Sequence, residues 1–385
     1  MKGLTLWRLL ALALLLSTPG CERKVRGAAN QDDVETPMPP PKPLRAGVSW
    51  QRIYAGAMGL SESAEAVTTD RFGNVLVGGS EGVRKRPRPW RQTDRGFLIK
   101  LDQEGRVLWR RVVGDEHSQV QHLATDEAGN VYVASSCCEV RKLSPGGRLL
   151  WKHQINKRLR GIAALPDGGA YVCAEGEWRN PSRLERLDGE GNLLWTRTVF
   201  PGLEEPSCAA VATASDGGVL VAAKASAGHP RRPVVMHLTA DDRVLWQTQL
   251  DEPAFEIKRL LPLPDGRILV STEDILPNSS GSSVLALAAD GSLLWNRRLD
   301  TAASNGERLP ELASGPDDRL LVVTSLERFE ISPYGEVLGQ EYITERRIMA
   351  MVTDPAGHLI EVGDTETRDV SIKKRPWPEP PSAPR

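Results

Sequence analysis

The sequence has 385 residues, with 49 basic and 50 acidic side chains and a formal net charge of −1 at pH 7. This balance argues against a general nucleic-acid-binding protein, because that class usually carries a basic surplus. The 35 glycines and 28 prolines predict many turns and few long helices, and no apolar run after residue 20 reaches the roughly 18 residues that a membrane-spanning helix needs.

The first 20 residues have the pattern of an export signal. Basic residues stand near the start, residues 9–16 form an apolar stretch, and small or turn-forming residues follow. Cys21 comes directly after them, and small residues before a cysteine resemble the lipobox of bacterial lipoproteins. We therefore predict a signal peptide over residues 1–20 and lipidation of Cys21, with ordinary cleavage after Gly20 as the alternative.

Residues 21–46 are rich in proline and show no hydrophobic periodicity. Such a segment stays extended and cannot bury a core, so we predict a lipid-anchored linker. In the polyproline conformation, at about 3.1 Å per residue, it would hold a folded domain up to ~75 Å from a membrane. Residues 376–385 are also proline-rich and are predicted to form a disordered tail.

Two short units repeat between these segments. The first is a turn with Asp or Gly followed by a β-rich run, as in DEAGNVYV at residues 126–133. Asp and Gly close such turns through side-chain hydrogen bonds and positive φ, and the aliphatic residues form strands. Seven copies occur, at residues 70–77, 126–133, 167–172, 216–221, 265–270, 317–322 and 354–360.

The second unit ends in tryptophan, as in LDQEGRVLW at residues 101–109. Successive tryptophans from Trp109 are 42, 44, 51 and 49 residues apart. Two hairpins within each such interval indicate four short strands, A to D, which is the pattern of a β-propeller blade. Further copies lie at residues 147–151, 187–195, 238–246 and 287–295, and a degenerate copy without tryptophan lies at 331–339.

The two ends of the repeat region complete one blade. Residues 48–55 have the pattern of an isolated fourth strand, and the last copy has room for only three strands, the last near residues 369–374. Pairing of these segments would close a ring and remove exposed sheet edges. The predicted fold is therefore an all-β, seven-bladed β-propeller over residues 47–375, closed by an N-terminal strand.

Both repeated units resemble the bacterial β-propeller repeats related to the PQQ-like repeat, which is named after pyrroloquinoline quinone. The similarity covers about residues 48–375. It implies the propeller fold but no single activity, because the family includes dehydrogenases, assembly-factor lipoproteins and many other exported proteins.

Six of the ten tryptophans occupy equivalent strand positions. Because they recur once per blade, we expect them to be buried where neighbouring sheets pack, as the resemblance also implies. A surface that stacks sugars or bases is the alternative. The six residues are Trp50, Trp109, Trp151, Trp195, Trp246 and Trp295.

The cysteines after Cys21 are Cys137, Cys138, Cys173 and Cys208, and an exported protein meets oxidising conditions that allow them to pair. The adjacent Cys137 and Cys138 fall in the B–C loop of blade 2 and are the candidate disulfide. At this point the chain is similar to quinoprotein alcohol dehydrogenases, in which an adjacent-cysteine disulfide covers the quinone. It departs from them in having seven units rather than eight and no recognisable catalytic Asp or calcium-ligand set, which favours an incidental or structural pair.

The A–B and C–D turns have nearly constant length, whereas the B–C and D–A connections vary and emerge together on one face. Several of these connections are basic. Solvated surface charge is the simplest interpretation, and a face that binds an anionic partner is the functional one. The candidate residues of this ligand face are Arg84, Arg86, Arg88, Trp90, Arg91, Arg158, Arg160, Arg231 and Arg232.

The sequence shows no catalytic constellation and no metal-ligand spacing, so we predict no catalytic residue, metal or cofactor. The leading hypothesis is a non-enzymatic cell-envelope lipoprotein, in the periplasm or at the cell surface, whose propeller is a binding or scaffolding platform. The expected partner is an envelope protein or an anionic glycan. We expect a monomer that binds no nucleic acid and contacts the membrane only through its lipid anchor. The alternative is a quinoprotein-like, PQQ-dependent oxidoreductase.

Overall fold

The computed structural model describes residues 34–40, 42–55, 62–84, 92–136, 138–155, 157–176, 182–200, 207–225, 232–250, 256–276, 279–299, 310–324, 327–343, 348–365 and 367–378. All of them belong to one structural unit, residues 31–385. Within these ranges the chain forms β-strands and a single 3₁₀ turn, Pro316–Asp318. The same ranges contain no helix that is both long and apolar enough to cross a membrane.

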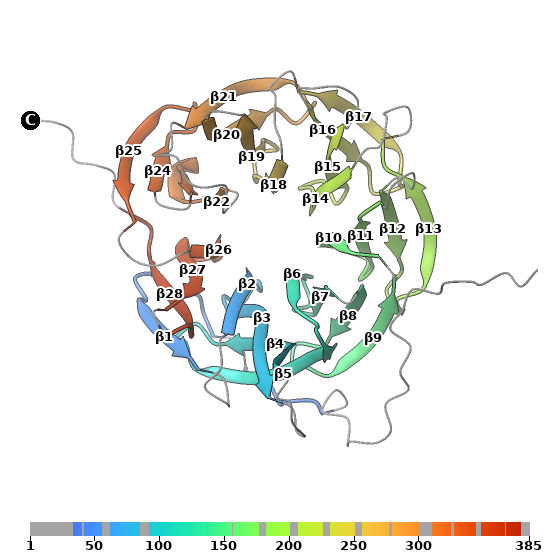
Figure 1. The fold of residues 1–385 in the computed structure, drawn as a ribbon, viewed down its shortest axis with the longest axis vertical. Helices are drawn as coiled ribbons and strands as arrows, with labels where there is room; N and C mark the ends of the chain where they lie inside the picture. The colour runs from blue at the N-terminus through green and yellow to red at the C-terminus, as the bar shows by residue number, and fades with distance from the viewer. Residues whose placement is uncertain are drawn as a thin grey trace, which may run out of the picture. The chain divides into compact units, whose positions relative to one another are not determined.

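The described strands form seven four-stranded sheets around one axis (Figure 1). Strand A of each blade lies nearest the axis and strand D lies outermost. Blade 1 contains β2 (Glu62–Thr69), β3 (Val75–Arg84), β4 (Gln92–Leu101) and β5 (Val107–Glu116). Blade 2 contains β6 (Val120–Thr125), β7 (Val131–Ser135), β8 (Glu139–Leu143) and β9 (Leu149–Gln154), and blade 3 contains β10 (Leu159–Ala164), β11 (Ala170–Ala174), β12 (Arg183–Leu187) and β13 (Leu193–Thr198).

The next blades repeat this order around the ring. Blade 4 contains β14 (Ser207–Thr213), β15 (Val219–Ala225), β16 (Arg232–Leu238) and β17 (Val244–Gln249). Blade 5 contains β18 (Glu256–Pro262), β19 (Ile268–Leu276), β20 (Ser279–Leu287) and β21 (Leu293–Leu299). Blade 6 contains β22 (Glu311–Ser314), β23 (Leu320–Val323), β24 (Glu327–Ile331) and β25 (Val337–Tyr342).

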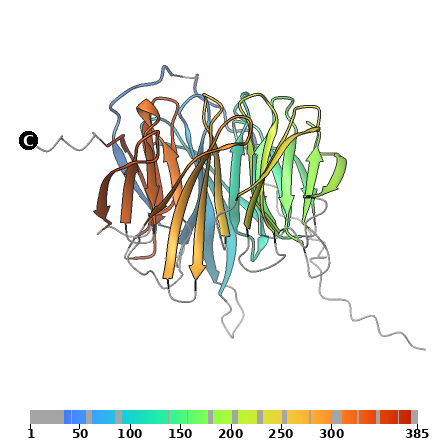
Figure 2. The same ribbon diagram turned by 90° about the horizontal axis from the view of Figure 1, so that it is seen from above.

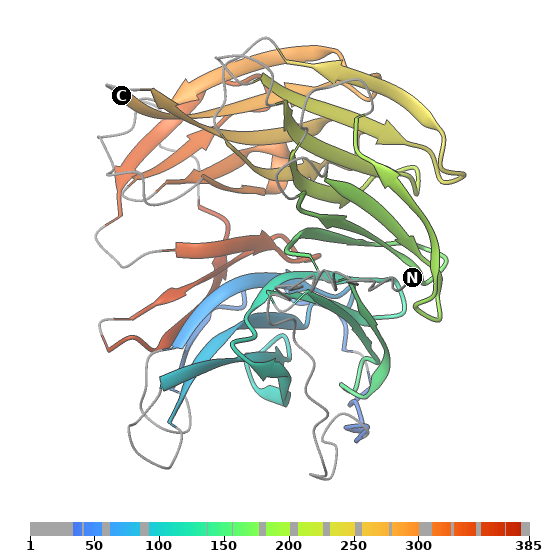
Figure 3. The ribbon, with the colours of Figure 1, turned by 45° about the vertical axis from the view of Figure 1, so that its right-hand side comes forward.

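Blade 7 joins the two ends of the repeat region. It contains β26 (Ile348–Thr353), β27 (His358–Asp364), β28 (Val370–Pro376) and, as its outermost strand, β1 (Trp50–Tyr54). The strands β1 and β28 pair antiparallel from Trp50 opposite Lys374 to Tyr54 opposite Val370, and Figures 1 and 3 show blue β1 beside red β28. The predicted seven-bladed propeller and its closure by an N-terminal strand are confirmed.

The A–B and C–D turns lie together on one side of the ring, which we call the turn face (Figure 2). Asp70 shows how they are built: its Oδ1 accepts hydrogen bonds from the backbone N–H groups of Phe72 and Asn74, each at 3.0 Å. Gly73 follows with φ of 74°, a conformation that side chains with a Cβ rarely adopt. The aspartate and the glycine of the repeat therefore have separate, local roles in the same turn.

Several turn aspartates also meet a cation from strand C. Lys100 Nζ lies 3.0 Å from Asp70 Oδ2, and both side chains are fully buried. In blade 7 the buried Lys374 Nζ lies 2.7 Å from Asp354 Oδ2. Buried charges need a partner, so each of these pairs depends on both of its members.

The six repeated tryptophans link every blade except the sixth to the blade that follows it. Trp109 Nε1 donates a 2.8 Å hydrogen bond to the carbonyl of Pro145 in the following blade, and its indole covers Gly147, whose missing Cβ would lie 3.1 Å from the ring. The expected packing role is confirmed, although only Trp50 and Trp109 are buried and the other four are partly buried. The other five donors and their acceptors are Trp50 to Gln103, Trp151 to Gly189, Trp195 to the Asp242 carboxylate, Trp246 to Ala289 and Trp295 to Pro333.

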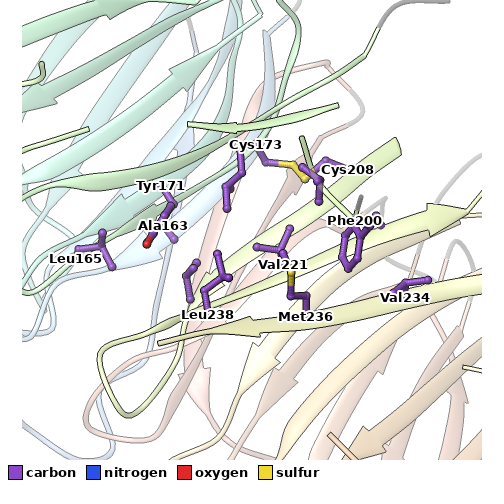
Figure 4. Packing of buried hydrophobic residues seen from close by; sticks show 14 residues of the cluster. Ala163, Leu165, Tyr171, Cys173, Phe200, Cys208, Val221, Val234, Met236 and Leu238 are labelled. Atoms are coloured by element: carbon purple, nitrogen blue, oxygen red, sulfur yellow. A yellow bond between two sulfur atoms is a disulfide. The ribbon is translucent and has the colours of Figure 1, made fainter. Parts of the chain in front are cut away.

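Hydrophobic side chains fill the spaces between successive sheets. One cluster joins blades 3 and 4 and includes Tyr171, Phe200 and Met236 (Figure 4). Another joins blades 7 and 1 through residues such as Ile372 and Phe97. The core is thus divided into layers between blades, as expected for an architecture in which each repeat packs on its neighbours.

The C-terminal segment differs from the disordered tail that we expected over residues 376–385. Trp377 is 7% exposed and packs against a cluster that contains Ala313, Leu321 and Met351. A large aromatic side chain stabilises the folded state by leaving water, and the missing side chain of Gly315 leaves room for the indole. The prediction is therefore wrong for Trp377, and residues 379–385 lie outside the described ranges.

The described part of the predicted linker is extended but rests on the propeller. Thr36 donates a 2.9 Å backbone hydrogen bond to Gly146, and Lys42 Nζ lies 3.0 Å from Glu104 Oε2. Met38 packs on the hydrophobic cluster between blades 1 and 2. This described part has no strand or helix of its own, and its residues 34–40 and 42–45 contact the turn face.

A candidate binding site at the mouth of the central channel

The innermost strands of six blades surround a channel around the axis of the ring. Near the ends where β2, β6, β10, β14, β18 and β22 begin, they line a cavity of about 340 Å³. Each of these strands follows a D–A connection, so its beginning lies on the side opposite the turn face. We call this side the loop face, and the cavity is the mouth of the channel on it.

A β-bulge near the start of six described inner strands inserts one extra residue at this mouth. Bulges bend a strand and redirect a side chain, and they are frequent next to functional sites. Five of the six inserted residues line the cavity, Met349 being the exception. The inserted residues are Glu65, Gln121, Arg160, Ala209, Lys258 and Met349.

Cationic side chains outnumber carboxylates around the cavity. Arg158 and Arg160 come from the start of blade 3, and Lys258 and Arg259 from the start of blade 5. The carboxylates that line it are Glu65 and Glu311. Among the described lining residues, the site therefore carries more positive than negative charge.

Two of these cations are held in place by one buried carboxylate. Glu311 is only 3% exposed, and its oxygens lie 3.3 Å from Lys258 Nζ and 3.2 Å from an Arg259 nitrogen. Arg259 also donates a 3.3 Å hydrogen bond to the carbonyl of Met351 in blade 7. The pairing fixes the two side chains across blades 5, 6 and 7 but neutralises only one of the two charges.

Blade 3 supplies a less constrained pair of cations. Arg160 donates a 2.6 Å hydrogen bond to Glu175 Oε1 on its own blade. Arg158, at the very start of the blade, is exposed to solvent. This side of the mouth therefore offers one guanidinium that is oriented by a carboxylate and one that is open to an incoming group.

The pKa of His122 reflects the positive charge around the channel. Burial, followed by the positive charge of Lys258, lowers the pKa of this imidazole from its usual 6.5 to about 3. Arg160 and Arg259 also lower this pKa, and a hydrogen bond with the backbone of Leu159 opposes them. The histidine is thus neutral at pH 7, and the cations that repel its proton would attract an anion.

The structure places only some residues of the predicted ligand face. Arg158 and Arg160 line the channel mouth, and Arg232 is an exposed residue at the beginning of β16. Arg84 is the last residue of β3, and the structure does not describe its side chain. Arg86, Arg88, Trp90, Arg91 and Arg231 lie outside the described residues, as do the predicted signal peptide and the predicted lipidation site Cys21.

Sequence reasoning missed His122, Lys258 and Arg259, because it sought basic residues in the connections rather than in the inner strands. A signal was present nonetheless. Every inserted bulge residue stands eight positions before the glycine of its A–B turn, as Lys258 does before Gly266. Alignment of the repeats on that glycine would have shown a column that varies in charge from blade to blade.

The structure contains a disulfide that the sequence analysis did not propose. Cys173 of β11 and Cys208 of β14 form a disulfide with a Cα–Cα distance of 6.2 Å, within the usual range (Figure 4). It joins blade 3 to blade 4 inside a buried cluster near the loop face. Cys138 Sγ lies 3.6 Å from the carbonyl of Ser136, and Cys137 lies outside the described residues, so their pairing stays a prediction.

Three solved structures to which this chain is similar are propellers. The Neurospora crassa Pan2 WD40 domain has a TM-score of 0.56 at 11% sequence identity, over 82% of this chain and 90% of that one. The WD40 β-propeller domain of Doa1 has a TM-score of 0.56 at 13% identity, over 85% and 96%, and the Dos1 propeller has 0.55 at 11%, over 87% and 97%. At these identities the likeness shows the fold alone.

At the level of sequence, no curated protein matches this chain. A family model does match it, over residues 94–228 and, overlapping them, over residues 180–370. These matches extend over more than half of the sequence and cover blades from the first to the seventh. The chain therefore belongs to the PQQ-repeat family described as outer membrane protein assembly factor BamB.

Proposed function

We propose that this protein is a non-enzymatic binding platform of the cell envelope that holds an anionic partner at the channel mouth. The observation that carries the proposal is the cationic channel: Arg158, Arg160, Lys258 and Arg259 converge from two blades on one cavity. The low pKa of His122, caused in part by three of these cations, is a second sign of the same field. An acidic protein segment or an anionic glycan is the partner that such a field would select.

Two further features support an envelope location. The matching family is named for an assembly factor of outer membrane proteins, and a scaffold that presents binding faces fits a role of this kind. The Cys173–Cys208 disulfide suits an oxidising compartment, where such bonds persist. With the export signal and the lipidation of Cys21 predicted from the sequence, we propose a lipid-anchored protein of the periplasm or cell surface.

The test compares two double variants of equal charge. Arg158→Ser with Arg160→Ser removes two cations from the channel mouth, whereas Arg106→Ser with Arg243→Ser removes two exposed cations from the turn face. Each protein is used to capture partners from detergent-solubilised envelopes, which are then eluted with a salt gradient. Wild type and the turn-face variant should retain the same partner, and the channel variant should lose it or release it at lower salt. Equal retention and equal salt dependence of all three would overturn the proposal.

The quinoprotein alternative stays a prediction. In the ranges that the structure describes, no group of three or more His, Cys, Asp or Glu side chains is placed to hold a metal ion. Incubation of the purified protein with PQQ and calcium, followed by quinone absorbance and dye-linked alcohol oxidation, tests this alternative directly. Turnover in that assay would replace the binding platform by an enzyme.

A further inference from the structure

The disulfide between Cys173 and Cys208 lies close to the channel mouth. It belongs to the hydrophobic cluster between blades 3 and 4, and both cysteines are fully buried (Figure 4). Cys208 directly precedes Ala209, the inserted bulge residue of β14, which lines the cavity together with the next two residues of the strand. The bond therefore joins two blades in the layer of side chains next to the cavity.

On blade 3 the same bond is adjacent to two cations of the mouth. Cys173 stands opposite Gly161 in the pairing of β10 with β11, and Arg160 is the residue inserted at this point. Two residues further along, the Glu175 N–H donates a 2.8 Å hydrogen bond to the Arg158 carbonyl, and Glu175 Oε1 accepts one from Arg160 at 2.6 Å. The segment that carries Cys173 thus holds both arginines.

A buried serine connects the same two parts of the chain. Ser182 is buried, and its Oγ accepts hydrogen bonds from the backbone N–H groups of Gly176 and Cys208, each at 3.0 Å. The segment after Cys173 and the start of β14 therefore share one acceptor. Water can replace such hydrogen bonds when the segments separate, whereas it cannot replace a covalent bond.

The boundary between blades 1 and 2 shows what the two cysteines replace. Gly78 lies five residues after its turn glycine, as Cys173 does. Val120 lies nine residues before its turn glycine, as Cys208 does. Val120 Cγ1 fills the place that a Cβ on Gly78 would need, so these two residues are in tight contact. Packing sets the separation of the blades at this boundary, and a covalent bond sets it between blades 3 and 4.

Repulsion between cations makes this boundary important. After burial, the charges of Lys258 and Arg160 lower the pKa of His122, so cations of blades 5 and 3 act on the same space. Like charges on opposite sides of a cavity favour its widening. The inner strands of blades 3 and 4 are nonetheless close together, because a Cβ on Gly161 would lie 2.9 Å from Val211 Cγ1. The disulfide opposes the separation of these strands.

We infer that the Cys173–Cys208 disulfide is a positioning element of the channel mouth. By holding β10 and β11 against β14, it keeps Arg158 and Arg160 within reach of an anionic group in the cavity. Without the bond, blade 3 moves outward with these two cations, water enters beside β10, and the affinity for anions falls. The inference rests on the proposed function for the ligand, but the arrangement of the mouth can be measured without a ligand.

His122 provides this measurement. It lines the cavity, a hydrogen bond with the backbone of Leu159 connects it to β10, and burial is the largest cause of its low pKa. In the protein with Cys173→Ala and Cys208→Ala, water beside β10 should raise the pKa of His122 from about 3 toward 6.5. An NMR titration of the imidazole signals of the folded protein gives this pKa, and His122→Gln identifies the signal.

Lys100→Met is the matched control. It removes one member of a buried ion pair on the turn face, so it should lower the free energy of unfolding without moving β10. His122 should then titrate as in wild type. An unchanged pKa in the double cysteine variant, or an equal rise in Lys100→Met, would show that the disulfide only stabilises the fold and would overturn the inference. A wild-type His122 that titrates near 6.5 would show an open mouth despite the bond, with the same consequence.

The capture experiment adds a second readout. The double cysteine variant should release the captured partner at lower salt than wild type, whereas Lys100→Met should not. Equal release from all three proteins would contradict the positioning role. If wild type captures no partner, the proposed function fails, and the titration of His122 still decides whether the disulfide positions the mouth.

Discussion

The two faces of this propeller are held together by different chemistry. On the turn face, most turns contain an aspartate, serine or threonine whose side chain accepts backbone hydrogen bonds, as Asp70 and Ser144 do, and a residue with positive φ follows it. Six turns also receive a hydrogen bond from a tryptophan of the previous blade, as Pro145 does from Trp109. Among the described residues at the channel mouth on the loop face, no such bond repeats. The inserted bulge residue changes from Glu65 to Gln121, Arg160, Ala209 and Lys258 around the ring.

Because of this difference, the residues that stabilise the fold and the residues available for binding a partner lie on opposite faces. A turn residue that closes a hairpin and also meets its neighbour blade cannot change without loss of both contacts. A bulge residue at the channel mouth contributes little to the ladder, because it stands outside the regular pairing. Substitutions on the turn face should therefore act on the free energy of unfolding, and those at the channel mouth on binding and pH response.

The largest effect should come from a buried ion pair on the turn face. Lys100→Met leaves the fully buried Asp70 carboxylate without its cation, and loss of one partner of a buried pair costs about 3–5 kcal/mol. The free energy of unfolding from urea titration measures this. Arg106→Met is the control, since this exposed residue also pairs with a turn aspartate, Asp102, but should change little. Equal losses in both variants would contradict the distinction between buried and exposed pairs.

The tryptophans should show a graded effect. Trp109 is 4% exposed, so Trp109→Ala should cost about 3–5 kcal/mol, the usual range for a buried aromatic side chain. Trp246 makes the same kind of hydrogen bond but is partly exposed, and Trp246→Ala should cost less. Unfolding monitored by circular dichroism measures both. A near-native Trp109→Ala protein would return the stacking-surface interpretation.

Near the loop face, a disulfide between blades 3 and 4 should contribute to the free energy of unfolding. The Cys173–Cys208 disulfide closes a loop with a sequence separation of 35, and its removal by Cys173→Ala with Cys208→Ala should cost about 2–4 kcal/mol. Wild type should lose similar stability when a reductant is added, whereas the double variant should not respond. Wild type that is insensitive to a reductant under unfolding conditions would show that the two cysteines are not bonded.

The effect that is smallest at neutral pH, and grows only in acid, concerns the channel mouth. With a pKa near 3 in the folded protein and 6.5 when unfolded, His122 takes up a proton only in the unfolded chain between these values. Stability should therefore be unaffected by this residue above pH 6.5 and fall as the pH decreases toward 3. His122→Gln should reduce this fall. Melting temperatures across that range measure it, and parallel curves for the two proteins would contradict the depressed pKa.

Much of the fold was predictable because the residues that form each turn and strand lie close together in the sequence. An Asp and a Gly in a turn, aliphatic runs and one tryptophan per blade give the strand count, and complementary end fragments give the closure. The prediction of a disordered tail failed at Trp377, because nothing in that local sequence shows that Gly315, far away in the chain, leaves room for an indole. The linker likewise has no pattern of its own that reveals Arg111 and Gly146 as its partners.

The sequence by itself determined the number of blades, the closing strand and the position of the tryptophans, since each follows from the pattern of the repeats and of the two end fragments. Only the tertiary structure decided which side chains meet across repeats. Cys173 and Cys208 pair because adjacent sheets bring β11 and β14 together, and Arg160 shares a cavity with Lys258 because both begin inner strands of the same ring. Such contacts depend on the geometry of ring closure, which no single repeat encodes.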